Sequence, residues 1–583
     1  MSPAPRPMTE LRGLPVSGGS RVGYALLFEE VPDVRAPAGG VSPDDVPGEL
    51  ARLDAAIEEA LAQLEGLQAS MEGQAGLVSG IFEAHAAMLN DAAPRLRAAV
   101  QEGNAAEHAV AVVLHTIRER LEALSNPVFK QRAQDIVDIE RRLLRALGSL
   151  SHETPDLTAA PLGPVVVVAS TLTPSEVAAF EGREIAAMVL EYGGPTSHSV
   201  LIAKSLGIPC VVGVMGVTRA VHPGDRIWVD GSEGLVVIAP DADTLERARG
   251  LGERYDRLEA ALLRESGLPA ETLDGYRASL LANVEFRPDV EAGVARGAEG
   301  VGLYRTEFLV DERGRLPTEE EQVATFRWTL EHLRGGALTI RTYDFGSDKP
   351  EVPDRRFEPN AALGERSLRW CFAHPEPFRA QLRALLRVAA EGDVRIMLPM
   401  VGGLEELRQA RRALAEASAE LAREGVAHRP DPPLGVMVEI PAAAMIADLL
   451  AREADFLSIG TNDLIQYGLA VDRLNPAVAH WFRPSHPALL RMIRTILDAA
   501  AVHRTPVTMC GEMGGQSIYT VLLFGMGVRA FSLTPGYLPR ARRLLRSLTA
   551  REARSLAAEC LRQTTADDVE ALLKARVQPV GRG

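Results

Sequence analysis

Two patterns of apolar residues divide the first part of the chain. Across residues 45–150, apolar positions recur at helical spacing, as in GELARLDAAIEEALAQLEGLQASMEGQ and VFKQRAQDIVDIERRLLRAL. Successive segments of this kind predict a compact helical bundle or a pair of helical hairpins. A different pattern begins near Pro161, where short apolar runs such as PVVVVAS, IAAMVLE and PCVVGV are separated by glycine turns. These runs predict a small α/β unit, and the opening segment PVSGGSRVGYALLFEE has the strand character to pair with it.

The second half of the chain alternates between strand-like and helical segments. A polar helical stretch across residues 245–265 is expected to connect the two halves and to act as a hinge. Eight apolar runs then recur between Tyr276 and Ser547: ASLLANV, GVGLYR, ALTIRTYDF, VRIMLPMV, LGVMVEI, DFLSIGTND, TPVTMCGE and VRAFSLTP. Eight strand–helix units in series predict a (β/α)8 barrel, in which catalytic groups gather at the C-terminal ends of the strands.

Composition narrows the class of protein. The 583 residues are enough for about three or four domains. The formal net charge of −15 argues against generic nucleic-acid binding, yet it is compatible with a basic protein partner. The four cysteines show no CxxC spacing, which indicates a reducing compartment and no zinc site. Neither a signal peptide nor an apolar run of membrane-spanning length is evident, so we expect a cytoplasmic enzyme or carrier without membrane insertion.

The stretch GGPTSHSVLIAKSLGIP places a histidine at the start of a short apolar helix. Glycine and proline interrupt regular structure first, and Thr196 or Ser197 is suited to cap the helix. His198 then lies in the first turn, where free N–H groups and partial positive charge favour a neutral imidazole and attract an anion. Such an imidazole could carry a phosphoryl group. The alternative interpretation is a histidine that is satisfied locally or packed under the helix.

Polar residues follow the expected strand ends of the barrel. Glu439 and Asp463 come from neighbouring strands, and two carboxylates completed by water and a ligand suit Mg²⁺. Donors that suit phosphate or carboxylate are Arg305, Arg341, Arg473 and Asn462. Each residue alone has a structural interpretation, such as an ion pair between Arg305 and Glu307. Together they predict a pocket for a small polyanion whose charge a metal offsets.

Cys510 ends the strand-like run TPVTMC and precedes GEMGG. Its structural interpretation is a small buried hydrophobe. Its functional interpretation is a proton donor or acceptor that faces a substrate carbon. Cys210, Cys371 and Cys560 lack comparable surroundings, and we interpret them as packing residues.

From Leu14 to Leu573 the chain resembles Enzyme I of the bacterial phosphotransferase system, the phosphoenolpyruvate–protein phosphotransferase family. The motifs that carry the resemblance are GGPTSHSVLIAKSLGIP, VGLYRTEFL, IRTYDFGSDK, RIMLPMV, GVMVEIPAA, SIGTNDLIQYGLAVDR and MCGEMGG. The resemblance implies a multidomain α/β protein. A swivelling phosphohistidine α/β domain (1–40 and 151–240) would hold an inserted all-α HPr-binding subdomain (41–150). A helical linker (241–270) would lead to a phosphoenolpyruvate-binding (β/α)8 TIM-type barrel (271–583), which would also form a homodimer.

The resemblance also implies roles for single residues. His198 would be phosphorylated on Nε2, and Cys510 would deliver the proton that turns enolpyruvate into pyruvate. Glu439 and Asp463 would bind Mg²⁺. The substrate-binding residues would be Arg305, Arg341, Asn462, Asp463 and Arg473. Arg366 would lie near the ligand, without an assigned role.

The implied reaction is the first step of phosphotransferase-system sugar uptake. The phosphoryl group would pass from His198 to a histidine of the small phosphocarrier protein HPr. Candidate docking residues on the helical subdomain are Phe82, His85 and Met88. Their alternative interpretation is the buried face of an amphipathic helix.

Departures from the family pattern lie close to the histidine. Pro195 and Lys204 stand where many relatives have arginine, and Ser347 replaces a common glycine, but none of these changes removes a reacting atom.

Two alternative functions remain. Pyruvate phosphate dikinase and phosphoenolpyruvate synthase share the histidine domain and the barrel. They also need a large nucleotide-binding region, and no P-loop GxxxxGK[ST] is present. A regulatory relative without turnover is a second alternative, which the complete set of reacting residues disfavours.

Overall fold

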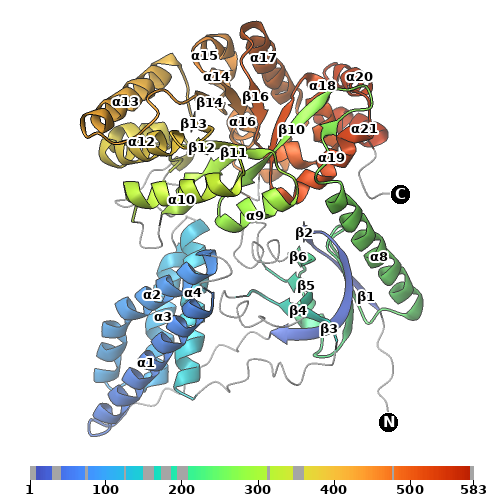
Figure 1. Cartoon of the computed structure of the whole chain (residues 1–583). Helices are drawn as coiled ribbons and strands as arrows, with labels where there is room; N and C mark the ends of the chain where they lie inside the picture. Colours follow the sequence, from blue (N-terminus) through green and yellow to red (C-terminus); the bar gives the residue numbers. More distant parts are fainter. Residues whose placement is uncertain are drawn as a thin grey trace. The chain divides into compact units, whose positions relative to one another are not determined.

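The computed structural model describes residues 8–28, 41–71, 76–123, 127–148, 163–172, 185–192, 208–310, 315–345, 360–473, 475 and 478–577. The chain forms two compact units, Met1–Glu259 and Ala260–Gly583, and each is described by itself (Figure 1). Among the described residues, no helix is long and apolar enough to cross a lipid bilayer.

The first unit contains a sheet built from segments that lie far apart in the chain. Its strands, listed here along the chain, are β1 (Thr9–Arg12), β2 (Leu14–Ser17), β3 (Ser20–Phe28), β4 (Val165–Ala169), β5 (Ile185–Leu190), β6 (Cys210–Val212), β7 (Arg226–Asp230) and β8 (Leu235–Ile238). Within the described part of the chain, their order in the sheet is β1-β8-β7-β3-β4-β5-β6-β2. β3 pairs with β4 in parallel and with β7 in antiparallel fashion, so the opening segment completes the sheet, as the sequence predicts.

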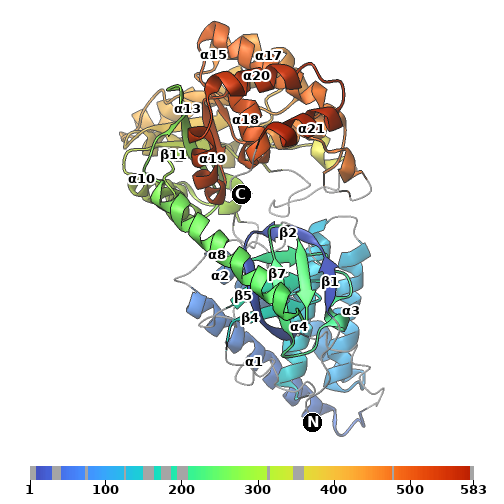
Figure 2. The same ribbon diagram turned by 90° about the vertical axis from the view of Figure 1, so that its right-hand side faces the viewer.

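The strands at the centre of this sheet are buried on both faces. All five residues of β4 are buried, and such continuous apolar runs are typical of strands covered on both sides. A short helix, α7 (Val217–Ala220), follows β6, and a long helix, α8 (Ala242–Arg264), follows β8. α8 lies along the sheet (Figure 2), where the Arg247 guanidinium stacks 5.2 Å from the ring centroid of Trp228. The predicted helical connector is therefore a single helix that packs on the sheet through its first half.

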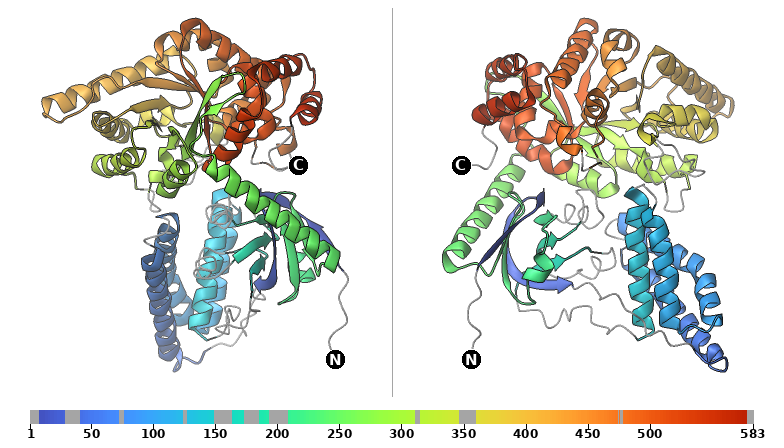
Figure 3. Two further views of the ribbon diagram at one scale, coloured as in Figure 1. Left: turned by 45° about the vertical axis from the view of Figure 1, so that its right-hand side comes forward. Right: turned by 180° about the vertical axis from the view of Figure 1, so that it is seen from behind.

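Four long helices form the bundle that the apolar spacing predicts (Figure 3). They are α1 (Val46–Met71), α2 (Gly76–Gln101), α3 (Ala106–Ala123) and α4 (Pro127–Ala146). Their shared core is aliphatic and includes Leu53, Leu89, Leu96, Leu114 and Leu143, each fully buried. Burial of this stripe stabilises the bundle, because helices of this length gain most of their stability from tertiary packing.

The second unit is a closed barrel, which confirms the predicted (β/α)8 fold. Its parallel strands are β10 (Arg277–Val284), β11 (Gly300–Arg305), β12 (Ala337–Arg341), β13 (Val394–Leu398), β14 (Leu434–Val438), β15 (Leu457–Ile459), β16 (Val507–Met509) and β17 (Ala530–Leu533). They pair in chain order, and β17 returns to β10, which closes the barrel. A short strand, β9 (Ala270–Glu271), pairs with β10 in antiparallel fashion.

Helices surround these strands (Figures 1 and 3). Those after the first four strands are α9 (Arg287–Ala295), α10 (Glu319–His332), α11 (Leu368–Ala373), α12 (Pro375–Ala389) and α13 (Leu404–Arg423). Those further along are α14 (Pro441–Met445), α15 (Ala447–Glu453), α16 (Thr461–Leu469), α17 (Pro487–His503), α18 (Ser517–Met526), α19 (Leu538–Arg546), α20 (Ala550–Cys560) and α21 (Ala566–Arg576). Short 3-10 turns, η1 (Thr306–Leu309) and η4 (Glu512–Gly515), follow β11 and β16. The main apolar core lies between the strands and these helices.

Candidate active site

The barrel strands carry most of the predicted site residues to one end. Parallel strands point the same way, so residues just after each strand meet at the C-terminal mouth. The predicted residues at these strand ends are Arg305, Arg341, Glu439, Asn462, Asp463 and Cys510. Their side chains therefore share one neighbourhood at the mouth of the barrel.

Each strand-end arginine holds an acidic partner. Arg341 is 5% exposed and its guanidinium pairs with Glu307, while its Nη1 lies 3.0 Å from Asp344 Oδ2. Arg305 pairs with Glu285, the residue directly after β10. The sequence-based interpretation offered Glu307 as the ion-pair partner of Arg305, whereas the recorded ion pairs join Glu307 to Arg341 and Glu285 to Arg305.

Arg366 lies at the centre of the acidic residues of the mouth. Its Nε lies 3.1 Å from Asp344 Oδ1, and its Nη1 lies 3.0 Å from Asp463 Oδ1. The same Nη1 donates to the Tyr467 hydroxyl over 3.0 Å. Arg366 is 3% exposed, so these contacts are shielded from water. Arg366, which the sequence placed only near the ligand, therefore makes some of the most extensive contacts of any cation in this site.

The two predicted metal ligands differ in their surroundings. Burial, together with the charges of Asp463 and Asp344, raises the pKa of Glu439 well above that of an ordinary carboxyl group. Burial also opposes ionisation of Asp463, but the charges of Arg366 and Arg473 and the hydrogen bonds from Arg366 together outweigh it and lower the pKa of Asp463. Glu439 is thus a buried carboxylate with too little positive charge nearby.

This donor set fits a magnesium ion. No cluster of three or more histidine, cysteine, aspartate or glutamate side chains suited to a metal occurs in the described part of the chain. Mg²⁺ does not need such a cluster, because it usually takes one or two carboxylates and fills its other positions with water and substrate oxygens. Glu439 and Asp463 would supply the two carboxylates, and a divalent cation beside Glu439 would offset the repulsion that helps to raise its pKa.

Cys510 is held as a neutral thiol. It is 4% exposed, and its Sγ donates to the carbonyl oxygen of Ile459 over 3.4 Å. Burial raises the pKa of the Cys510 thiol to about 11. The Asn283 side-chain amide donates to the Cys510 carbonyl oxygen over 3.1 Å, which fixes the backbone here. A protonated thiol at neutral pH is suited to donate a proton and poorly suited to act as a nucleophile.

Asn462 and Arg473 lie at the outer part of the site. The Asn462 side-chain amide donates to Glu512 Oε1 over 3.0 Å, and its oxygen accepts the Glu512 backbone N–H over 3.3 Å. Arg473 is exposed after α16, and its charge helps to lower the pKa of Asp463. Arg473 is therefore close enough to act on Asp463 through its charge.

The predicted phosphohistidine, His198, lies outside the described residues, as do Pro195 and Lys204. The chain just before this segment is firmly held. Glu191 follows β5, is 3% exposed, and accepts the Gly216 backbone N–H over 2.8 Å and the Thr218 hydroxyl. The carboxylate thereby ties the end of β5 to the start of α7.

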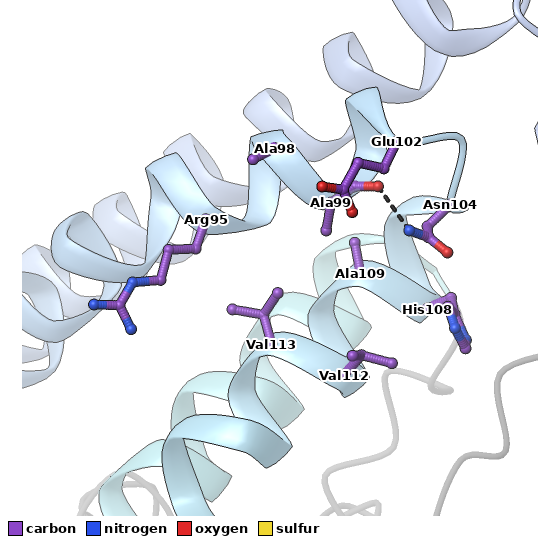
Figure 4. Close-up of a pocket in the computed structure, with 9 residues that line it drawn as sticks. All are labelled: Arg95, Ala98, Ala99, Glu102, Asn104, His108, Ala109, Val112 and Val113. Carbon is purple, nitrogen blue, oxygen red and sulfur yellow. Dashed lines mark hydrogen bonds between the residues drawn. The ribbon is translucent and has the colours of Figure 1, made fainter. Parts of the chain in front are cut away.

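The candidate docking residues of the bundle differ in exposure. His85 is fully buried, with Nδ1 3.1 Å from Asp138 Oδ2, so it cannot contact a partner directly and the docking interpretation is wrong for this residue. Met88 is half-buried, and the Phe82 side chain lies outside the described residues. A depression of about 320 Å³ lies between α2 and α3 (Figure 4). Its polar edge includes Arg95 and His108, and none of the predicted site residues lines it.

Sequence reasoning missed Glu285 and paired Glu307 with Arg305 in place of Arg341. Glu285 follows β10 and Glu307 follows β11 within two residues, so both satisfy the strand-end rule that selected the other residues. Asn283, the other polar residue near the end of β10, contacts the Cys510 backbone. The signal was therefore present, but the pattern alone did not separate Glu285 from a residue that caps the next helix.

Comparisons with known proteins agree with this architecture. Residues 259–550 match the PEP-binding domain of PEP-utilising enzymes, residues 162–234 their mobile domain, and residues 12–132 their N-terminal domain. The phosphoenolpyruvate-protein phosphotransferase of Geobacillus stearothermophilus is 39% identical over 572 residues, which cover 97% of each chain.

A second relative has the same name. The Bacillus subtilis (strain 168) phosphoenolpyruvate-protein phosphotransferase is 36% identical over 575 residues, with 97% of this chain and 99% of that protein covered. An NMR solution structure of Enzyme I is 28% identical and covers 42% of this chain and 99% of its own, with a TM-score of 0.36. By the extent and identity of the sequence matches, the chain belongs to the phosphoenolpyruvate-protein phosphotransferase family.

Proposed function

We propose that this enzyme transfers the phosphoryl group of phosphoenolpyruvate to its own His198 and then to a histidine of the phosphocarrier protein HPr, releasing pyruvate. The single observation that carries the proposal is the convergence of arginines, a buried carboxylate pair and a neutral thiol at one barrel mouth. The family to which the chain belongs performs phosphoenolpyruvate-dependent phosphotransfer, which is the reaction that this combination of groups serves.

The arginines would bind and orient the substrate. Arg305 and Arg341 stand at adjacent strand ends, and their forked donors match the phosphate and carboxylate of phosphoenolpyruvate. Asn462 adds an amide donor, and Arg473 adds a charge at the outer edge. Because phosphoryl transfer asks little covalent work of the protein, most of the acceleration would come from positioning and from stabilising charge.

Glu439 and Asp463 would hold Mg²⁺, which when bound neutralises charge on the transferring phosphoryl group. The family uses a metal, and the magnesium assignment is part of our proposal. Arg366 would keep Asp463 ionised and ready to bind, because its charge lowers the pKa of Asp463. The Met400 backbone N–H would orient the Glu439 carboxylate, to which it donates over 2.7 Å.

The bond changes are as follows. His198 Nε2 forms a bond to phosphorus while the bond from phosphorus to the enol oxygen breaks. The enolate that leaves takes a proton on its terminal carbon from the Cys510 thiol, and the thiolate regains a proton from solvent. The high pKa of Cys510 suits this role, since the thiol is protonated before each turnover.

The remaining parts of the proposal concern organisation. The phosphohistidine domain would comprise residues 1–40 and 151–240, the HPr-binding subdomain 41–150, the linker 241–270 and the barrel 271–583. The barrel would form a homodimer. A cytoplasmic location is supported by the four free cysteines, all buried, which point to a reducing compartment.

The test is phosphorylation with labelled phosphoenolpyruvate and Mg²⁺. We expect one acid-labile label that maps to His198, is absent from His198→Ala and disappears when HPr is added. ATP with pyruvate should give no label, which separates this enzyme from pyruvate phosphate dikinase. An unlabelled wild-type chain, or equal labelling of His198→Ala, would overturn the proposal.

A further inference from the structure

Glu285 is a carboxylate placed against a predicted substrate-binding arginine. It directly follows β10, and Arg305 is the last residue of β11, the neighbouring strand of the barrel. The two side chains form an ion pair through Arg305 Nη1, and less than a third of each is exposed. An acidic side chain of the protein thus takes up one donor of Arg305, Nη1, before any substrate arrives.

The backbone around Glu285 is braced. Asp289 Oδ2 accepts the backbone N–H groups of Glu285 and Phe286, over 3.1 and 3.0 Å, at the start of α9. The Phe286 ring lies 5.3 Å, centroid to centroid, from that of Phe308, which follows Arg305 in η1. Asp289 thus fixes the backbone at Glu285, and the two rings join the segments after β10 and β11, which keeps the Glu285 carboxylate within reach of Arg305.

The ion pair leaves the charge of Glu285 only partly offset and one N–H of Arg305 without a hydrogen-bond acceptor. Burial raises the pKa of Glu285, Arg305 opposes this effect, and the charges of Asp289 and Glu307 add to it. The Arg305 Nε is buried without a hydrogen-bond partner in the described structure, although a guanidinium can donate through all three of its nitrogens. A buried donor without a partner is unfavourable, so this position of Arg305 is not the one that best uses its hydrogen-bonding capacity.

We propose that Glu285 is an internal competitor for Arg305, which holds the guanidinium away from substrate and weakens the binding of phosphoenolpyruvate. The inference rests on the proposed function, in which Arg305 binds the substrate. Two effects act in the same direction. The carboxylate occupies an Arg305 donor, Nη1, that a phosphate would use, and its charge repels a trianionic substrate in a partly water-excluded mouth.

As a consequence, the affinity for phosphoenolpyruvate is lower than it would be if Arg305 were not paired with Glu285. Phosphoenolpyruvate must displace Glu285 from Arg305 as it binds, so the free energy needed to break the existing ion pair reduces the net binding free energy. Glu285 thus tunes affinity without touching the reacting phosphorus.

The test measures phosphoenolpyruvate binding to the full-length His198→Ala chain, which cannot accept the phosphoryl group. Calorimetry with Mg²⁺ present gives the reference Kd. Adding Glu285→Gln, which keeps the side chain's shape but removes its charge, should lower the Kd about three- to tenfold. Glu285→Ala should change the Kd in the same direction. The matched control is Glu291→Gln, an exposed carboxylate on α9, which should leave the Kd unchanged.

A double-mutant cycle with Arg305→Ala identifies the route of the effect. If Glu285 acts through Arg305, then Glu285→Gln should tighten binding much less in the Arg305→Ala background than in its presence. An unchanged or higher Kd in both Glu285→Gln and Glu285→Ala would overturn the inference, since Glu285 would then be neutral or would position Arg305 for binding. No phosphoenolpyruvate binding by the His198→Ala chain itself would instead count against the proposed function.

Discussion

Met400 donates its backbone N–H to Glu439 Oε1 over 2.7 Å, across the ends of β13 and β14. Met400 has a φ of 53°, a left-handed conformation that turns its N–H toward the neighbouring strand end. A buried carboxylate with a raised pKa is thereby held in one orientation by the backbone. This fixed orientation is what our proposal that Glu439 binds a cation requires.

Glu439→Gln should remove the response of the enzyme to metal. In the wild type, chelation with EDTA should abolish labelling by phosphoenolpyruvate, and added Mg²⁺ should restore it. The amide cannot replace a carboxylate ligand, so we expect labelling of Glu439→Gln to fall about 100-fold or more at saturating Mg²⁺. Asp448→Asn, an exposed acidic position on α15, is the matched control. Wild-type metal dependence in Glu439→Gln would contradict the ligand assignment.

Arg341→Ala should destabilise the barrel as well as abolish labelling. The change removes the cation that pairs with buried Glu307 and one of the two arginines that pair with buried Asp344, since Arg366 remains there, and breaking a buried ion pair typically costs about 3–5 kcal/mol. Arg327→Ala removes an exposed ion pair with Glu391 and should cost less than about 1 kcal/mol. Urea unfolding followed by tryptophan fluorescence measures both. Equal losses for the two variants would show that burial of the Arg341 pairs adds no stability.

Cys510 should react slowly with iodoacetamide in the folded protein. Its pKa of about 11 means that thiolate is scarce at pH 7, because the thiolate fraction falls about tenfold for each pH unit below the pKa. Unfolding in urea restores an ordinary thiol pKa and access, so alkylation should accelerate. Peptide mapping separates Cys510 from the other buried cysteines. Rapid alkylation of Cys510 in the folded protein at pH 7 would contradict the assignment of a neutral thiol. In a separate test, Cys510→Ser should slow pyruvate release while the barrel stays folded.

Thr318→Ala should weaken the start of α10. The Thr318 hydroxyl accepts the Glu321 backbone N–H over 3.3 Å, and Glu321 accepts the Thr318 backbone N–H over 2.7 Å, so the two residues form a reciprocal cap. Loss of such a cap typically lowers the free energy of unfolding by about 0.5–2 kcal/mol. Thr325→Ala, on the same helix, is the comparison because its hydroxyl bonds to a carbonyl within the helix.

The same cap predicts an acid dependence. Contacts with Arg315 and with Thr318 lower the pKa of Glu321 to about 2. Because the folded pKa is depressed, the stabilisation is present above the unfolded value of 4.5 and is lost as the pH falls from there to about 2. Solvent screening keeps the effect small at this exposed site. Glu321→Gln should flatten this part of the stability profile, measured by urea unfolding at several pH values. An identical acid slope in Glu321→Gln would contradict the cap's contribution.

The elements and the barrel were predictable because their signals are local. The alternation of apolar runs with amphipathic helices specifies eight strand–helix units, and the strand-end rule then selects Arg341, Glu439 and Cys510 without any three-dimensional information. His85 shows where this reasoning fails. The histidine lies on an amphipathic helix, and only packing of the bundle decided that its side chain faces Asp138 in the interior.

By itself, the sequence determined the order of the elements and the chemical types gathered at the barrel mouth, since periodicity and strand direction depend on neighbouring residues alone. Tertiary structure decided which carboxylate meets which arginine. Glu285 pairs with Arg305, and Glu307 pairs with Arg341. Arg366 contacts both Asp344 and Asp463, although Asp463 lies 97 residues further along the chain. The physical reason is that these pairings depend on strand register and side-chain direction across the closed barrel, which local patterning does not encode.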